Sequence, residues 1–272
     1  MLTRLAVRGF KRLEEAEIEL GQAVVLVGPN NSGKTTALQA LALWQTGLTA
    51  WIARRSDTEA RERLGVTLNR RALTQIPVLE TRDLFSGRRA TRDKGGRQSR
   101  LEVHVAGQDA SGAWELGLQF QYSNPESVLV QPVRADGGAE GPVVVPAQAQ
   151  ATRIAFLPPM SGLVPEEPEW AGGRIDVLIG EGQTAQVLRN LCLRVHEKDP
   201  DAWRGIVRGL RGMFGVELLE PSRDTSRGIV ELRYKEGKTD FDVTAAGRGL
   251  QQVLLLLAHL RANPGAVLVL DE

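Results

Sequence analysis

The residues whose types and spacing could do chemistry lie near the two ends of the chain. Near the start, Gly28-Pro29-Asn30-Asn31-Ser32-Gly33-Lys34-Thr35 fits the phosphate-binding pattern G-x-x-x-x-G-K-[ST], and near the end Asp271 and Glu272 follow an apolar run. In such a loop the glycines let backbone N–H groups point at phosphate oxygens. The lysine reaches the β- and γ-phosphates, and the hydroxyl of Thr35 can ligate magnesium. The pattern predicts a nucleoside triphosphate site.

The segments that flank the loop match what such a site requires. Residues 23–27 form a short apolar run with the β-branched content and length of a buried strand. Residues 36–44 are rich in helix formers and contain neither Gly nor Pro. A helix starting near Gly33 would direct its first N–H groups and about half a positive charge at a phosphate. A chance glycine-rich turn is the alternative, and the strand–loop–helix context argues against it.

The acidic pair at the other end is predicted to serve the same ligand. Residues 266–270 are apolar and read as a buried strand that carries Asp271 and Glu272 to the carboxyl edge of a sheet, where ligands bind in open α/β folds. Asp271 would hold magnesium through its water shell, and Glu272 could orient or deprotonate the attacking water. A strand that ends in exposed acids is the alternative, which the phosphate loop upstream disfavours.

A second glycine pair precedes a second predicted helix. Gly247 and Gly249 lead through Gln251 and Gln252 into the apolar run 253–260, and Asn263-Pro264-Gly265 would stop that helix. Two glycines at a helix start form a potential anion site. Alone the pattern is weak evidence, and the acidic strand end that follows strengthens it.

Composition sets broad limits on the protein class. The chain has 272 residues, 42% hydrophobic and 25% charged residues and a net charge of +1, which is ordinary for a soluble globular protein and gives no global attraction to nucleic acid or membranes. One cysteine excludes an intrachain disulfide, and the three histidines show no metal-ligand spacing. The longest apolar run, residues 253–258, is too short to span a bilayer, so we expect a cytoplasmic protein.

The rest of the chain alternates between β-rich and helical stretches. Apolar–polar alternation and turn residues predict strands over 2–7, 16–20, 101–105, 114–122, 127–130, 143–145, 152–157, 229–234 and 241–243, with helices over about 56–71 and 183–214. Residues 87–97 are dense in Arg, Lys and Gly. They could contact nucleic acid, but a solvated surface loop is favoured because no aromatic residues are interleaved.

Together these motifs resemble an ABC-type ATPase head of the OLD/RecF-like AAA family. The phosphate loop, the opening Val7-Arg8-Gly9-Phe10-Lys11-Arg12 and the stretch Gly247-Arg248-Gly249-Leu250-Gln251-Gln252 carry the resemblance, and Phe156-Leu157-Pro158-Pro159-Met160-Ser161-Gly162-Leu163 is similar to ATPases of anti-phage systems such as PARIS and OLD. The resemblance implies an α/β fold: a P-loop ABC-type core with an N-terminal antiparallel β meander, a β-rich insertion and a helical lobe. The expected divisions are 1–44, 45–150, 151–221 and 222–272.

The resemblance also implies site residues and partners. ATP and Mg²⁺ are the expected cofactors, with Lys34 and Glu272 catalytic, and with Thr35 and Asp271 holding the metal. Nucleotide contacts are expected from Asn30, Asn31, Ser32, Gly33, Lys34, Thr35, Thr36, Lys11 and Arg12, and in trans from Gly247, Gly249 and Gln251 or Gln252. Two heads would sandwich ATP in a homodimer or higher oligomer, which could act with a TOPRIM-type nuclease or with DNA.

The sequence departs from the family pattern at positions that would affect the rate of ATP hydrolysis. The signature serine has no clear equivalent, since Ala246, Gly247 or Arg248 occupies its neighbourhood, and Pro159-Met160 stand where a Q-loop glutamine is expected. The chain stops at Glu272, before the D-loop, switch histidine and nuclease domain that the resemblance implies, so we expect it to be a fragment of a longer protein. If it is complete, hydrolysis should be slow.

Three functions follow from these observations. The first is an ATPase head that dimerises around ATP and gates a DNA-directed or anti-phage effector. The second is a non-hydrolysing, nucleotide-gated scaffold that recruits a partner nuclease. A transporter ATPase is disfavoured because the insertion is large and no membrane-coupling motif is evident.

Overall fold

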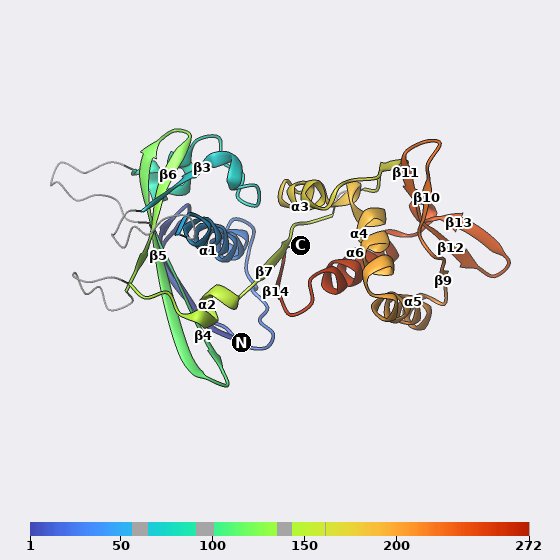
Figure 1. Ribbon diagram of the computed structural model, residues 1–272, viewed down its shortest axis with the longest axis horizontal. Helices are drawn as coiled ribbons and strands as arrows, with labels where there is room; N and C mark the ends of the chain where they lie inside the picture. The colour runs from blue at the N-terminus through green and yellow to red at the C-terminus, as the bar shows by residue number, and fades with distance from the viewer. Residues whose placement is uncertain (56–64, 91–100, 135–142, 161, 272) are drawn as a thin grey trace. The chain divides into compact units, whose positions relative to one another are not determined.

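The computed structural model describes residues 1–55, 65–90, 101–134, 143–160 and 162–271. The chain forms two compact units, Met1–Ile154 and Ala155–Glu272 (Figure 1). The basic stretch 91–97 and the catalytic candidate Glu272 lie outside the described residues. None of the helices in the described ranges is long and apolar enough to cross a membrane.

A six-stranded antiparallel sheet is the frame of the first unit. Its strands are β1 (Leu2–Phe10), β2 (Leu13–Glu19), β3 (Val66–Asn69), β4 (Leu101–Asp109), β5 (Gly112–Asn124) and β6 (Ser127–Val133), in the order β2-β1-β4-β5-β6-β3. On β4 the buried residues Leu101, Val103 and Val105 alternate with half-buried ones, as expected of a strand with one covered face. The β4–β5 hairpin turns at Gly112, whose φ of 127° suits glycine.

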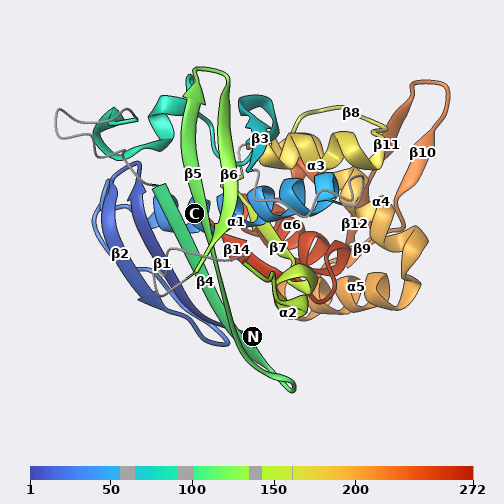
Figure 2. The same cartoon turned by 60° about the vertical axis from the view of Figure 1, so that its left-hand side comes forward.

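Helix α1 (Lys34–Arg55) covers the apolar face of this sheet, as Figures 1 and 2 show. Trp44 is fully buried on the helix, and its indole N–H donates to the carbonyl of Leu116 over 2.9 Å. Its ring stacks on that of Trp114 with the centroids 6.2 Å apart. Burial of these large aromatic side chains fixes the helix that begins at the phosphate loop to strand β5.

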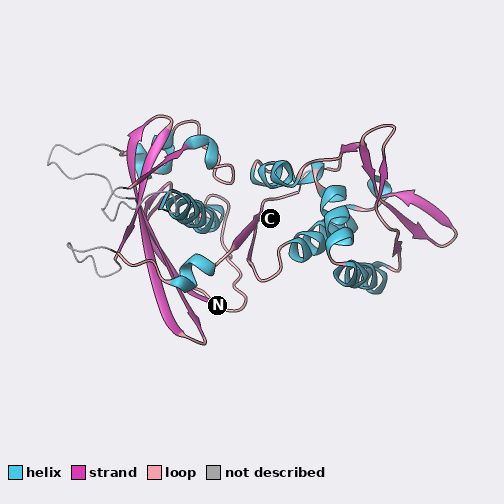
Figure 3. Ribbon diagram, in the orientation of Figure 1, coloured by secondary structure: helices cyan, strands magenta, loops and turns pink. Residues whose placement is uncertain are grey.

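The second unit is mainly helical (Figure 3). Helices α3 (Gly172–Gly180), α4 (Leu188–Lys198), α5 (Pro200–Phe214) and α6 (Arg248–Ala262) enclose a core that includes Leu191, Trp203, Ile206, Leu254 and Leu255. Asp199 caps α5 by accepting from the N–H of Ala202, and Pro200 occupies the first turn. The predicted helical stretch 183–214 is confirmed, whereas α3 was not predicted.

Short strands complete the second unit. They are β8 (Glu167–Pro168), β9 (Glu217–Leu218), β10 (Ser222–Asp224), β11 (Ile229–Glu231), β12 (Arg233–Glu236) and β13 (Thr239–Asp242), and β7 (Ile154–Leu157) pairs with β14 (Val267–Leu270). The hairpin predicted around Gly237 is confirmed as β12–β13. The strands predicted at 152–157 and 266–270 are confirmed and lie side by side.

Three secondary-structure predictions were wrong. The run 23–27 is not a strand: Val25 and Val27 are 84% and 90% exposed, because an apolar run forms a strand only where a neighbour accepts its backbone hydrogen bonds, and the six-stranded sheet does not include it. The charged segment 56–71 was predicted helical, but its part at Val66–Asn69 is β3, whose burial alternates with period two. Residues 143–145 likewise form no strand.

The predicted α/β class, antiparallel meander and helical lobe are confirmed. Strands from the predicted insertion, β4 to β6, continue the same sheet as the N-terminal strands because β4 pairs with β1 along its length. The short helix α2 (Ala147–Ala151) precedes the end of the first unit. The four-part division at 44, 150 and 221 stays a prediction.

Candidate nucleotide-binding site

The phosphate loop has the backbone geometry of an anion-binding turn. Asn31 and Gly33 have positive φ values of 65° and 101°, and the N–H of Ser32 donates to the carbonyl of Pro29 over 3.2 Å. Helix α1 then starts at Lys34, and its first turn contains no acidic residue. The first turn of a helix directs N–H groups and the positive end of the helix dipole outward, so a phosphate is favoured there.

Lys34 folds back over the loop. Its Nζ donates to the carbonyl oxygens of Gly28 and Pro29 over 2.8 and 3.0 Å. An ammonium group placed among loop carbonyls and helix N–H groups supplies the cation that a polyphosphate requires. The donors present therefore fit a nucleoside triphosphate.

The turn between β1 and β2 lies against this loop. A Cβ placed on Gly33 would lie 3.0 Å from Cδ2 of Leu13, so the loop closes over the start of β2. Arg12 is exposed in the same turn. The first unit thus brings the predicted contacts Lys11 and Arg12 close to the phosphate loop, from which they are separated by about twenty residues of sequence.

Lys11 is held in a half-buried position beside α1. Its backbone N–H donates to the carbonyl of Leu84 over 2.8 Å, and its side-chain Nζ donates to Oε1 of Gln39 over 2.7 Å. Burial lowers the pKa of Lys11 to about 8, and the charge of Asp83 partly opposes this change. The charge of Lys11 should therefore respond to pH near 8.

The second glycine pair lies at the start of α6. Gly247 is the N-cap residue, without a side-chain capping bond, and Gly249 is exposed in the first turn. Gln252 is exposed, whereas Gln251 is 6% exposed and donates to the carbonyls of Val243, Thr244 and Ala246 over 3.1, 3.3 and 3.0 Å. The two adjacent glutamines therefore have different surroundings.

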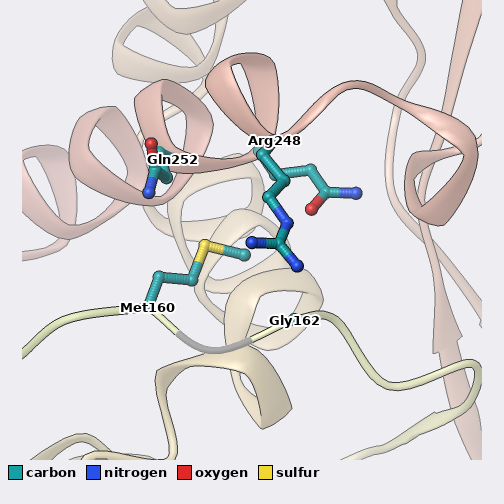
Figure 4. Close-up of a pocket in the computed structure, with 5 residues that line it drawn as sticks. Met160, Gly162, Arg248 and Gln252 are labelled. Carbon is teal, nitrogen blue, oxygen red and sulfur yellow. The ribbon is translucent and has the colours of Figure 1, made fainter.

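A cavity of about 250 Å³ adjoins the start of α6 (Figure 4). It is lined by Met160, Gly162, Arg248, Gln251 and Gln252. Figure 4 shows the side chain of Arg248 directed toward the segment that carries Met160 and Gly162. Neither Met160 nor Arg248 was among the predicted site residues, although Met160 lies in the segment 156–163, which the sequence analysis found similar to anti-phage ATPases.

The acidic strand end is described up to Asp271. The N–H of Asp271 donates to the carbonyl of Leu157 over 3.0 Å, which continues the β7–β14 pairing to the last described residue.

The two predicted magnesium ligands belong to different units of the chain, Thr35 to the first and Asp271 to the second. A hydroxyl and a carboxylate oxygen are suitable ligands for Mg²⁺. Across the described ranges there is no group of three or more His, Cys, Asp or Glu residues arranged to hold a metal. The metal assignment stays a prediction.

Comparison with known proteins finds similarity over parts of the chain. Residues 1–51 match the AAA ATPase domain family. Over 43 residues the chain is 49% identical to the OLD nuclease of Thermus scotoductus (strain ATCC 700910 / SA-01). That match covers 16% of this chain and 8% of the relative, so the chain spans a small part of the relative's length.

Similar solved structures align along the whole chain at low identity. They include the SMC head domain from Thermotoga maritima, with a TM-score of 0.46, 14% identity and coverage of 77% of that structure. The recombination mediator protein RecF–ATPrS is similar with a TM-score of 0.46, 11% identity and coverage of 85% of that structure. For RecF–ATP the TM-score is 0.45, the identity 12% and the coverage of that structure 86%.

The matched segment 1–51 contains β1, β2, the phosphate loop and most of α1, which are the elements that form the site in the first unit. The resemblance to an AAA ATPase that the sequence predicts is confirmed for this part of the chain: residues 1–51 are similar to the AAA ATPase domain family.

Proposed function

We propose that this chain binds ATP at the phosphate loop and is an ATPase that self-associates around the nucleotide. The observation that carries the proposal is the placement of Lys34, whose ammonium lies on the loop carbonyls at the N-terminus of α1 within the segment similar to AAA ATPase domains. A lysine held in the loop, outward N–H groups and an acid-free first turn together favour a polyphosphate.

The predicted residues then have separate roles. Lys34 would neutralise phosphate charge, Thr35 and Asp271 would hold the magnesium, and Glu272 would orient the attacking water. When bound, Mg²⁺ neutralises the charge that develops on the phosphate oxygens. Asn30, Asn31, Ser32, Gly33 and Thr36 line the phosphates as loop and first-turn residues.

Self-association is supported by the start of α6. Gly247 and Gly249 are exposed, and a Cβ on either would meet nothing within 4 Å inside the chain, so both are open to a ligand presented by a second copy. In the proposed dimer these glycines and Gln252 contact the γ-phosphate bound to the partner.

The name of the related OLD nuclease supports a further proposal about what the dimer controls. We propose that nucleotide binding gates a cytoplasmic, DNA-directed defence effector such as a TOPRIM-type nuclease.

Sedimentation velocity with and without ATP and Mg²⁺ tests the proposed association. The wild-type chain should sediment as a dimer only with nucleotide, and Lys34→Ala should remain monomeric. Gly249→Asp should also remain monomeric while still binding ATP, because the new carboxylate would repel the γ-phosphate without an internal clash. Lys198→Ala removes an exposed lysine from α4 and serves as the control. A monomeric wild-type chain at saturating ATP would refute the dimer.

A nucleotide-gated scaffold is the second candidate function. Comparison of ATP binding with steady-state phosphate release separates it from an ATPase. Binding and dimerisation without release would favour the scaffold, whereas release that Asp271→Asn abolishes would favour the ATPase.

A further inference from the structure

The second unit contains a buried polar network that the proposed site does not use. Glu167, Arg189 and Asn190 are 0%, 1% and 3% exposed. The carboxylate of Glu167 accepts from the backbone N–H of Arg189 over 2.9 Å and from the backbone N–H and side-chain amide of Asn190, each over 2.7 Å. Glu167 thus caps the start of α4, where the helix dipole favours a negative charge.

The guanidinium of Arg189 joins two segments that are far apart in sequence. It donates to the carbonyls of Val164 and Pro165 over 3.0 and 3.4 Å, and through Nη2 to Oδ1 of Asp242 over 3.0 Å. The planar fork of an arginine holds several acceptors in fixed directions. Burial of its charge is unfavourable unless such partners are in place, so the network favours the arrangement of the two segments that supplies them.

Asp242 begins the turn that leads into α6. Its Oδ1 also accepts from the N–H and hydroxyl of Thr244 over 2.8 and 2.6 Å, and it caps the single 3₁₀ turn Val243–Ala245. We refer to residues 242–247 as the signature turn, because it ends at Gly247, the N-cap of α6. The arginine therefore fixes the first residue of this turn.

Gln251 holds the same turn from the helix side. Its amide donates to three of the carbonyls of the signature turn, and its side chain is buried. Within the described part of the chain the side-chain hydrogen bonds of Gln251 go to the turn. Its neighbour Gln252 is exposed. The geometry therefore distinguishes one glutamine that supports the turn from one that is open to a ligand.

We infer that Arg189 and Gln251 are positioning residues for the trans nucleotide contact. They hold the signature turn between α4 and α6, and Arg189 ties it to the carbonyls at 164–165, which continue the segment carrying the cavity residues Met160 and Gly162. The inference rests on the proposed function, since the contact that is positioned is that of Gly247, Gly249 and Gln252 with ATP on a second copy. It assigns Gln251 no contact with the nucleotide.

The test uses Asp242→Ala, because Asp242 is 41% exposed at its side chain and its loss leaves the buried Glu167 cap in place. Asp240→Ala, an exposed acid on the same hairpin, is the matched control with the same change of charge. Arg189→Met removes the other partner, and Arg189→Lys should restore part of its effect because it keeps a donor. Folding of each variant is checked by its cooperative thermal transition.

Two readouts are measured on the full chain: hydrogen exchange over residues 243–250 and ATP-dependent sedimentation. Asp242→Ala and Arg189→Met should raise exchange in this segment at least tenfold and weaken ATP-dependent dimerisation at least tenfold. Their affinity for ATP, measured at a protein concentration at which the wild type is monomeric, should stay within twofold of the wild type, because the phosphate loop lies in the other unit. Asp240→Ala should change none of these.

Unchanged exchange in a folded Asp242→Ala or Arg189→Met variant would overturn the inference, as would raised exchange with normal dimerisation. An equal loss in the ATP affinity of the monomer would also overturn it. Failure of the proposed function is seen separately, as a wild-type chain that stays monomeric with ATP.

Discussion

The Nζ of Lys11 lies 2.7 Å from Oε1 of Gln39, so the turn between β1 and β2 is fastened to the helix that starts at the phosphate loop. Leu13 makes a second contact with the loop, at Gly33. The loop is therefore supported by the first hairpin of the chain as well as by α1.

We expect Lys11 to make the affinity for ATP depend on pH. Burial lowers its pKa to about 8, and a bound polyphosphate would raise that pKa, so we expect proton uptake when ATP binds near pH 8. Affinity for ATP should therefore fall as pH rises from 7 to 9. Calorimetry in two buffers with different ionisation enthalpies measures both the affinity and the proton uptake.

Lys11→Met should lose most of this proton uptake and flatten the pH dependence. Lys198→Met, which changes an exposed lysine of the other unit, should retain both. Equal proton uptake by Lys11→Met and the wild type would exclude Lys11 as the titrating group.

Gly33 should tolerate no side chain. Its φ of 101° lies outside the region that residues with a Cβ adopt readily, and a Cβ would lie 3.0 Å from Leu13. Gly33→Ala should cost about 1–2 kcal/mol of backbone strain and displace the loop, so ATP affinity should fall. Gly21→Ala is the matched control, because a Cβ there meets nothing within 4 Å. Equal urea midpoints and equal ATP affinities for the two variants would contradict this prediction.

Trp44 should contribute strongly to the stability of the first unit. Trp44→Phe removes the indole donor and leaves the buried carbonyl of Leu116 without that partner, which costs about 1–3 kcal/mol. Equilibrium unfolding in urea should show this loss as a lower midpoint at an unchanged m-value. A change below about 0.5 kcal/mol would mean that another donor or water replaces the indole.

The sequence predicts the helices and loops whose signals are local. The phosphate loop, α6 and the strand ending at Leu270 follow from residue types within about ten positions. The run 23–27 was predicted wrongly because its apolar content does not specify which strand would pair with it. The β3 strand was missed because the charges that surround it suggested a solvated helix, although Val66 and Leu68 alternate with polar residues.

The Arg189 network depends on contacts that no local pattern reveals. Glu167 and Asp242 lie 22 and 53 residues from Arg189, whose position on an amphipathic helix suggests a solvent-exposed charge. The burial of Gln251, in contrast, had a signal: Leu254, Leu255 and Ala258 follow it at three, four and seven positions, so it belongs to the buried stripe of α6. Helical periodicity alone could have separated Gln251 from Gln252.

Equilibrium dialysis with labelled ATP and Mg²⁺ tests the central claim most directly. The wild-type chain should bind one ATP, and Lys34→Ala should bind about tenfold to a hundredfold more weakly, because it loses a charge-assisted contact with the phosphates. Lys198→Ala should bind as the wild type does. Failure of the wild-type chain to bind ATP, or equal affinity in Lys34→Ala, would contradict the assignment of the phosphate loop as a nucleotide site.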